Sequence, residues 1–194
     1  MPSHSYLIQF FQNSGKFNAI RAAEISEQFE ERTFDKNEIF LKEGLVSNEY
    51  LILEAGMMRA FVHDVEGNEV TTGFFNDHQV VFEVTSFFMR IPSRENIQAL
   101  TSCKGWVISF EKLNGLFHAL PEFREFGRGV LVKCFAAHKL RTVSMITETA
   151  EQRYAALINS NPEIFQYAPL KYIASYLGIT DTSLSRIRKE MARK

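Results

Sequence analysis

The last 26 residues, PLKYIASYLGITDTSLSRIRKEMARK (169–194), contain the pattern that decides how the C-terminal part of the chain folds. Proline is well tolerated in the first turn of a helix, so a helix is predicted to begin at Pro169. Its apolar face recurs at helical spacing and consists of Leu170, Ile173, Ala174 and Leu177. Gly178 follows directly and can adopt the left-handed conformation that ends a helix. The pattern predicts a short helix with a sharp stop.

A second short helix is predicted to start at Thr180, because threonine is a good N-cap residue. Its buried side is expected to contain Leu184, Ile187 and Met191. Two short helices joined by a glycine-containing turn form a helix-turn-helix. The alternative is a plain helical hairpin with a solvated basic face, but such a hairpin requires neither the small Ala174 nor a glycine four positions later.

The open face of the second predicted helix is polar and basic, and it carries Thr180, Asp181, Thr182, Ser183, Ser185, Arg186, Arg188 and Lys189. From Pro169 onward, six basic residues against two acidic ones give a net charge of +4, whereas the whole chain carries −1. Positive charge gathered on a motif that can enter a major groove is typical of DNA binding. The predicted partner is double-stranded DNA.

The composition indicates a globular protein with an aromatic-rich core, since 45% of the 194 residues are hydrophobic and 18 are phenylalanine. Cys103 and Cys134 lie far apart, which argues against a disulfide framework, a cysteine-ligated metal site and an iron–sulfur cluster. No basic region is followed by a long apolar run. We therefore expect a soluble cytoplasmic protein without a membrane partner.

The order of patterns along the chain predicts an α+β fold. Helical spacing continues to about Glu31, and short apolar runs separated by turn residues then extend to Phe110, as in an antiparallel sandwich or barrel. The stretch from Asn76 to Glu95 is less regular. We expect an antiparallel β-roll or jelly roll in residues 1–118, a connecting helix in residues 119–146 and an all-α helix-turn-helix domain in residues 147–194.

The connecting helix has a seam of apolar and small residues at about 3.5-residue spacing, formed by Phe123, Phe126, Val130, Cys134, Ala137, Leu140 or Arg141, and Ser144. Such a seam is buried either against the β-domain or against the same helix of a second subunit. Because small side chains at Ala137 and Ser144 permit close approach, we favour the second interpretation, a homodimer formed through residues 119–146.

Motifs in both halves of the chain belong together. They are the glycine-punctuated pattern Gly44…Tyr50-Leu51-Ile52-Leu53…Gly56…Arg59, then TAEQRY (149–154) and PLKYIASYLGIT (169–180). In this order they resemble the Crp/Fnr superfamily of bacterial transcription regulators. The resemblance implies a dimeric, sequence-specific regulator that binds a roughly palindromic operator, with RNA polymerase as a candidate partner. By family position, Asp181, Thr182 and Arg186 would contact base edges, and Thr180, Ser183, Ser185, Arg188 and Lys189 would hold phosphates.

The resemblance also implies a place for an effector. In members that bind cyclic nucleotides, a Gly-Glu pair and a later Arg-Ser/Thr-Ala element hold the ribose and the cyclic phosphate. The matching residues here are Phe82, Glu83, Arg94 and Glu95. Phe82 replaces the glycine, and Glu95 places a negative charge where a phosphate-facing hydroxyl would lie. We therefore expect no control by cyclic AMP or GMP, no cofactor and an effector of unknown identity, with Glu83 and Arg94 paired or facing solvent.

The family usually continues beyond the recognition helix into a β-hairpin wing, whereas this sequence ends at Lys194. We expect the wing to be absent and Arg193 and Lys194 to form a short basic tail. The alternative function is a ligand-binding β-roll module whose helical tail contacts proteins rather than DNA. A jelly-roll enzyme would need a metal-binding His-x-His pair, and the sequence contains none, so we expect neither an enzyme nor a metal site.

Overall fold

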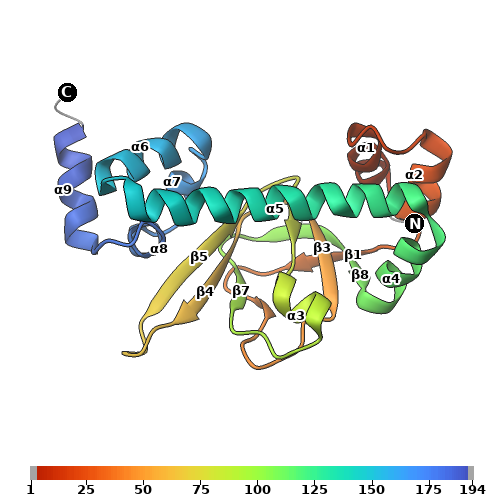
Figure 1. Ribbon diagram of the computed structural model, residues 1–194, viewed down its shortest axis with the longest axis horizontal. Helices are drawn as coiled ribbons and strands as arrows, with labels where there is room; N and C mark the ends of the chain where they lie inside the picture. Colours follow the sequence, from red (N-terminus) through yellow and green to blue (C-terminus); the bar gives the residue numbers. More distant parts are fainter. Residues whose placement is uncertain (1–3, 192–194) are drawn as a thin grey trace.

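The computed structural model describes residues 4–191 (Figure 1). Its elements in chain order are α1 (Ser5–Asn13), α2 (Ala19–Ser26), β1 (Glu30–Phe34), β2 (Ile39–Leu41), β3 (Glu49–Ala55), β4 (Met58–His63), β5 (Glu69–Phe75), β6 (Val80–Val81), α3 (Val84–Met89), β7 (Asn96–Ala99), β8 (Cys103–Ser109), α4 (Phe110–Ala119), α5 (Pro121–Thr147), α6 (Ala150–Ser160), α7 (Ile164–Tyr167), α8 (Leu170–Tyr176) and α9 (Asp181–Met191). The predicted α+β fold class is confirmed.

The strands form a roll of two four-stranded antiparallel sheets, with orders β1-β8-β3-β6 and β2-β7-β4-β5. Leu51 of β3 and Ile97 of β7 are fully buried between the sheets. Gly105 of β8 lies so close to β3 that an added Cβ would be 2.5 Å from Leu51 Cδ1 and 2.7 Å from the carbonyl oxygen of Ile52. Glycine is therefore required at this strand pairing.

The N-terminal helices pack against the beginning of α5 through aromatic rings. The ring of Phe11 in α1 lies 5.6 Å from that of Phe17 and 5.4 Å from that of Phe126 in α5, measured between centroids. Ring pairs at this separation contribute beyond the apolar area they bury. The expected aromatic core therefore joins α1 to the beginning of α5, and Figure 1 shows both at the same end of the molecule.

Several local predictions need correction. The second helical segment, predicted to continue to about Glu31, ends at Ser26, because residues from Glu30 onward pair with β8 as a strand. The sequence pattern from Asn76 to Glu95 is less regular and no element was assigned there, but this stretch contains strand β6 and helix α3. The short helix α7 was not predicted either.

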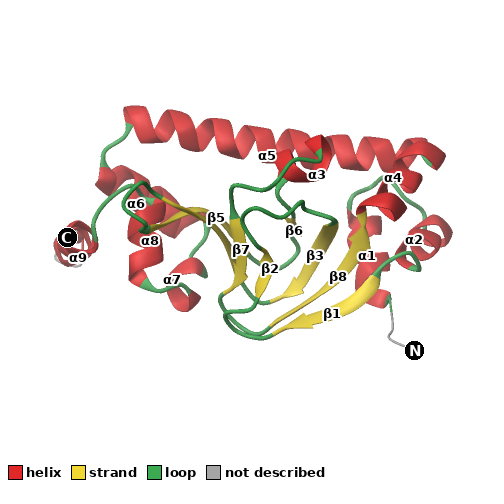
Figure 2. Cartoon of the chain, turned by 90° about the horizontal axis from the view of Figure 1, so that it is seen from below, coloured by secondary structure: helices red, strands yellow, loops and turns green. Residues whose placement is uncertain are grey.

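Helix α5 extends along the whole molecule, from α4 beside the N-terminal helices to α6 (Figure 2). Part of the seam predicted as a dimer contact packs within the chain itself, since Phe123 and Phe126 are buried and Cys134, Arg141 and Ser144 are half-buried, whereas Ala137 and Leu140 are exposed. The buried part of the seam agrees with the first interpretation weighed above, burial against the β-domain, and the favoured homodimer contact through residues 119–146 stays a prediction. None of the helices in the described residues could cross a membrane.

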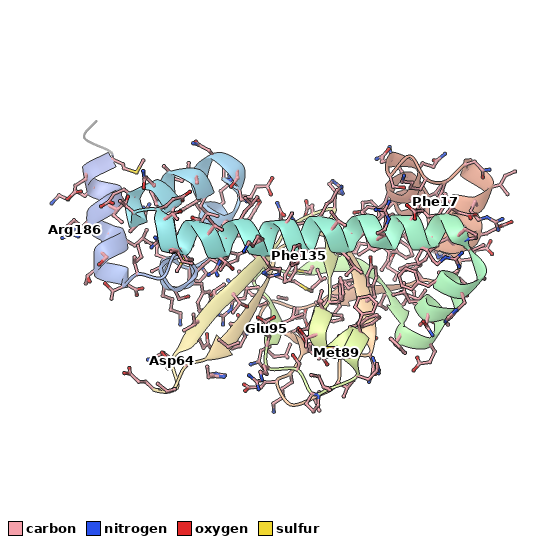
Figure 3. All side chains as sticks on the ribbon, in the orientation of Figure 1. Phe17, Asp64, Met89, Glu95, Phe135 and Arg186 are labelled. Atoms are coloured by element: carbon pink, nitrogen blue, oxygen red, sulfur yellow. The ribbon has the colours of Figure 1, made fainter. Side chains whose placement is uncertain are left out.

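A different side of α5 carries apolar side chains that remain exposed among the described residues. This exposed stripe consists of Val132, Phe135, Leu140, Val143 and Ile146, with Phe135 73% and Ile146 79% exposed, and it shares Leu140 with the predicted seam. Phe135 is labelled on α5 in Figure 3. A run of large exposed apolar residues on a helix marks an interaction surface.

Candidate nucleic-acid interface and effector pocket

Helices α8 and α9 form the predicted helix-turn-helix. The backbone N–H of Ile179 donates to the Ala174 carbonyl (3.0 Å), and Gly178 has a φ of 68°, so the turn closes as a left-handed helix stop. The Thr180 hydroxyl oxygen accepts a hydrogen bond from the Ser183 backbone N–H (3.2 Å), as expected of an N-cap. Leu184 of α9 is fully buried, which fixes α9 against the rest of the motif.

Details of this motif differ from the prediction. Pro169 precedes α8 as its N-cap residue instead of occupying the first helical position. Leu170 is 39% exposed and Met191 is 38% exposed, although both were expected on buried faces. Each lies in a terminal turn of its helix, beyond the core formed by Ile173, Leu184 and their neighbours. Helical spacing alone does not show where that core ends.

The residues predicted to contact DNA lie together on α9. Thr180, Asp181, Thr182, Ser185, Arg186, Arg188 and Lys189 are exposed, and Ser183 is half-buried. Figure 3 shows Arg186 at the end of the molecule farthest from the N-terminal helices. Within residues 4–191, no ion pair involves Arg186, Arg188 or Lys189. Arg193 and Lys194 lie outside the described residues.

Asp181 is the acidic residue in the first turn of α9, and Arg188 and Lys189 lie in its last turn. A carboxylate at the N-terminal end and cations at the C-terminal end both interact favourably with the helix dipole. This distribution stabilises α9 and leaves its middle positions, Ser185 and Arg186, free for contacts with a ligand. The placement of Asp181 thus has a structural reason besides contact with a base.

The residues predicted for the effector pocket do not converge on one ligand. Phe82 belongs to the hydrophobic core, and its ring lies 5.1 Å from Tyr50 and 5.6 Å from Phe87 between centroids. The side chain therefore fills space instead of opening it. Of the other phenylalanines in this region, Phe88 is partly exposed and Phe74 packs on Tyr176.

Glu83 is the N-cap of α3. Its carboxylate accepts hydrogen bonds from the backbone N–H groups of Thr85 (2.9 Å) and Ser86 (2.6 Å). The amides that begin this helix are thus already bonded to a carboxylate and are not available to a phosphate. Arg94 faces solvent, and no ion pair joins it to Glu83 among the described residues. Glu83 and Arg94 were expected to pair with each other or to face solvent. Arg94 does face solvent, whereas Glu83 caps α3.

Glu95 is a half-buried carboxyl beneath α5. Burial raises the pKa of the Glu95 carboxyl above its usual range, and the charge of Glu83 acts in the same direction. Thr72, His138 and Arg141 lie close enough to oppose this shift. A second negative charge, that of a cyclic phosphate, would add to the repulsion. The carboxyl groups of Glu83 and Glu95 at this position would therefore repel a phosphate.

Sequence reasoning missed two features near this interface, the exposed stripe of α5 and the contact of α8 with the β-roll. No group of three or more histidine, cysteine, aspartate or glutamate side chains in the described part of the chain could hold a metal ion. The candidate nucleic-acid interface consists of the exposed polar and basic side chains of α9.

Comparisons with known proteins agree with this architecture. Residues 31–119 match the family model described as cyclic nucleotide-binding domain. A search of curated protein sequences finds no match to the chain. Solved structures with a similar fold include a protein from Eubacterium rectale designated a transcriptional regulator of the Crp/Fnr family, with a TM-score of 0.74 and 17% identity over 95% of this chain and 88% of that one.

Two further structures are similar over most of their length. FixK2 from Bradyrhizobium japonicum has a TM-score of 0.74 and 14% identity, covering 85% of each chain. The c-di-GMP-responsive global regulator CLP from Xanthomonas campestris has a TM-score of 0.69 and 15% identity, covering 88% of this chain and 92% of that one. Residues 31–119 thus resemble a cyclic nucleotide-binding domain, and the chain shares its overall fold with these solved regulators.

Proposed function

We propose that the chain is a dimeric, sequence-specific DNA-binding regulator of transcription that is not controlled by cyclic AMP. The observation that carries the proposal is the polar face of α9, where Arg186, Arg188 and Lys189 are exposed and have no ion-pair partner among residues 4–191. Cationic groups without internal partners are available to neutralise DNA phosphates. The chain would therefore act in the cytoplasm, with RNA polymerase as a candidate partner.

The exposed stripe of α5 supports the dimeric part of the proposal. Five large apolar side chains on one helix face would be buried if two copies of α5 packed side by side about a two-fold axis. The two copies of α9 would then enter successive major grooves, with half-sites about 34 Å apart. The expected operator is a rough palindrome.

The independence from cyclic AMP rests on Phe82, Glu83 and Glu95. Phe82 fills the core, and the Glu83 carboxylate accepts hydrogen bonds from the amides at the start of α3. Burial of the Glu95 carboxyl already disfavours its charged form. CLP is described as responsive to c-di-GMP, so effectors differ among proteins of this fold.

Selection of bound duplexes from a random DNA pool by the purified full-length protein tests the proposal, with and without added cyclic AMP. We expect enrichment of one palindrome to the same extent in both conditions. Binding of that palindrome should weaken steeply as salt concentration rises, because phosphate contacts release counterions.

Other outcomes contradict specific parts of the proposal. Enrichment only in the presence of cyclic AMP would show that the residues at Phe82 and Glu95 accept the nucleotide after all. No enrichment in either condition would favour the alternative, a β-roll module whose helical tail contacts proteins.

A further inference from the structure

The helix-turn-helix packs directly on the outer face of the sheet that contains β4 and β5. The Thr71 backbone N–H of β5 donates to the Ser175 hydroxyl of α8 (3.1 Å), and that hydroxyl donates to the Thr71 hydroxyl (3.2 Å). The rings of Phe74 and Tyr176 lie 5.2 Å apart between centroids. Figures 1 and 2 both show β5 running towards α8. The DNA-reading motif is therefore held by the roll as well as by its connecting helix.

Arg59 of β4 lies at the centre of this contact and is completely buried. Its guanidinium carbon is 4.1 Å from the centroid of the Phe61 ring and 3.4 Å from the centroid of the Tyr172 ring, which belongs to α8. The guanidinium also donates to Glu69 of β5 (2.5 Å) and Gln98 of β7 (2.9 Å). It thus joins three strands of the sheet to the first helix of the DNA-reading motif.

The burial of Arg59 requires α8. Met58 and Ala60, its neighbours on β4, point into the core between the sheets, so the alternation of a strand directs Arg59 to the outer face. Burying a charge is costly unless it is paired, and Nη1 of Arg59 has no hydrogen-bond partner among the described residues. The free-energy cost of burying this charge must be offset by the contacts of the guanidinium with its neighbours, or the residue must serve a role besides stability.

The geometry of a guanidinium explains what that role can be. The group is planar and rigid, and its bonds to Glu69 and Gln98 fix its orientation on the sheet. Tyr172 stacks on its face, so the position of α8 follows the orientation of Arg59. An aliphatic side chain would fill the same space without fixing an orientation.

We propose that Arg59 is a positioning residue for DNA binding, which sets the orientation of α8 and therefore of α9 relative to the β-roll. The inference rests on the proposed function, because two α9 helices of a dimer reach both half-sites only if each is held at a fixed angle. A single half-site makes no such demand. Arg59 should therefore matter for the palindrome and not for one half-site.

The test compares two full-length variants, Arg59→Leu and the matched control Arg32→Leu. Arg32 also lies on a strand, stacks on a phenylalanine two residues later (4.7 Å to the Phe34 ring centroid) and pairs with a glutamate (2.9 Å to Glu49). It belongs to β1 in the other sheet. Both changes remove the same kind of interaction, but only Arg59→Leu removes the contact with α8.

Two measurements are made on each variant, hydrogen exchange of the Thr71 amide and affinity for the selected palindrome and for one half-site. For Arg59→Leu, we expect the Thr71 amide to exchange at least about tenfold faster while the core amides of β3 stay protected. Affinity for the palindrome should fall at least about tenfold with half-site affinity unchanged, because simultaneous engagement is lost. Arg32→Leu should change none of these quantities.

Equal palindrome affinity of the wild-type protein and Arg59→Leu, together with unchanged exchange at Thr71, would overturn the inference. Failure of the wild-type protein to bind any duplex would contradict the proposed function instead, while the exchange measurement would still report whether Arg59 holds α8. If Arg59→Leu does not fold, Tyr172→Leu removes the same stacking from the α8 side and should give the same selective loss on the palindrome.

Discussion

Arg186 is one of the three side chains on α9, with Asp181 and Thr182, that are predicted to contact base edges. It is exposed in the middle of the helix, between the capping residues and the basic last turn. We expect Arg186→Ala to cost about 1–3 kcal/mol in binding to the selected operator and to relax the preference at one base position. Repeating the DNA selection with this variant, together with competition binding, measures both effects.

Arg188→Ala is the matched control, because Arg188 is predicted to hold a phosphate. Its loss should weaken binding uniformly across sequences and reduce the slope of log affinity against log salt by about 1. An operator preference that is unchanged in Arg186→Ala would remove Arg186 from the residues that read bases.

The effector position shows what single residues reveal and what they do not. The sequence indicated that Phe82 and Glu95 depart from a cyclic-nucleotide site, and in the structure Phe82 belongs to the core and Glu95 is half-buried. The capping role of Glu83 was not predictable, because α3 itself was not predicted. A six-residue helix gives too short a periodic signal to distinguish it from a loop.

Helix α5 shows the limit of periodicity at the scale of an element. The predicted seam and the exposed stripe both recur at helical spacing, so α5 is apolar on two sides. Spacing identifies the faces but does not tell which one meets the protein's own core. For the N-terminal part of the seam, that choice is made by the aromatic ring of Phe11 in α1, which packs on Phe123 and Phe126 and turns them inward.

This assignment predicts which substitution dissociates the dimer. We expect Phe135→Glu to weaken dimerisation at least about 100-fold, because each copy would bury a carboxylate in an apolar contact. Ala137→Glu is the control, since Ala137 is exposed on the same helix but belongs to the seam first predicted. Sedimentation equilibrium over a range of protein concentrations measures both. A dimer that survives Phe135→Glu but dissociates with Ala137→Glu would restore the original seam.

At the scale of the whole molecule, the roll and the helix-turn-helix share one hydrophobic core. Met57 and Leu100 of the roll are buried together with Ile164, Ile173 and other residues of the C-terminal helices. The sequence predicted the helix-turn-helix as a separate unit, because its motif is complete within about 25 residues. Contacts between residues 100 positions apart leave no periodic signal, so the docking of α8 on β4 and β5 was not predictable from spacing.

The shared core predicts that the chain unfolds as one unit. Trp106, the single tryptophan, lies in β8 of the roll, whereas most helical signal comes from segments outside the sheets. Tryptophan fluorescence and far-ultraviolet circular dichroism should therefore report the same denaturant midpoint at a fixed protein concentration. Leu184→Ala, a change in the fully buried core of α9, should lower the free energy of unfolding by about 2–5 kcal/mol and shift both midpoints equally.

Met191→Ala is the control for that variant, because Met191 lies on the same helix and is partly exposed, and it should move neither midpoint appreciably. If Leu184→Ala shifts the circular dichroism transition and leaves the Trp106 transition unchanged, the helix-turn-helix unfolds independently of the roll. Arg59 and Ser175 would then hold only a weak contact, and the orientation of α9 would have to be set by α5 alone. If both unfolding midpoints shift equally, α9 and the sheet unfold together. The buried contacts of α8 with β4 and β5 provide the physical link between them.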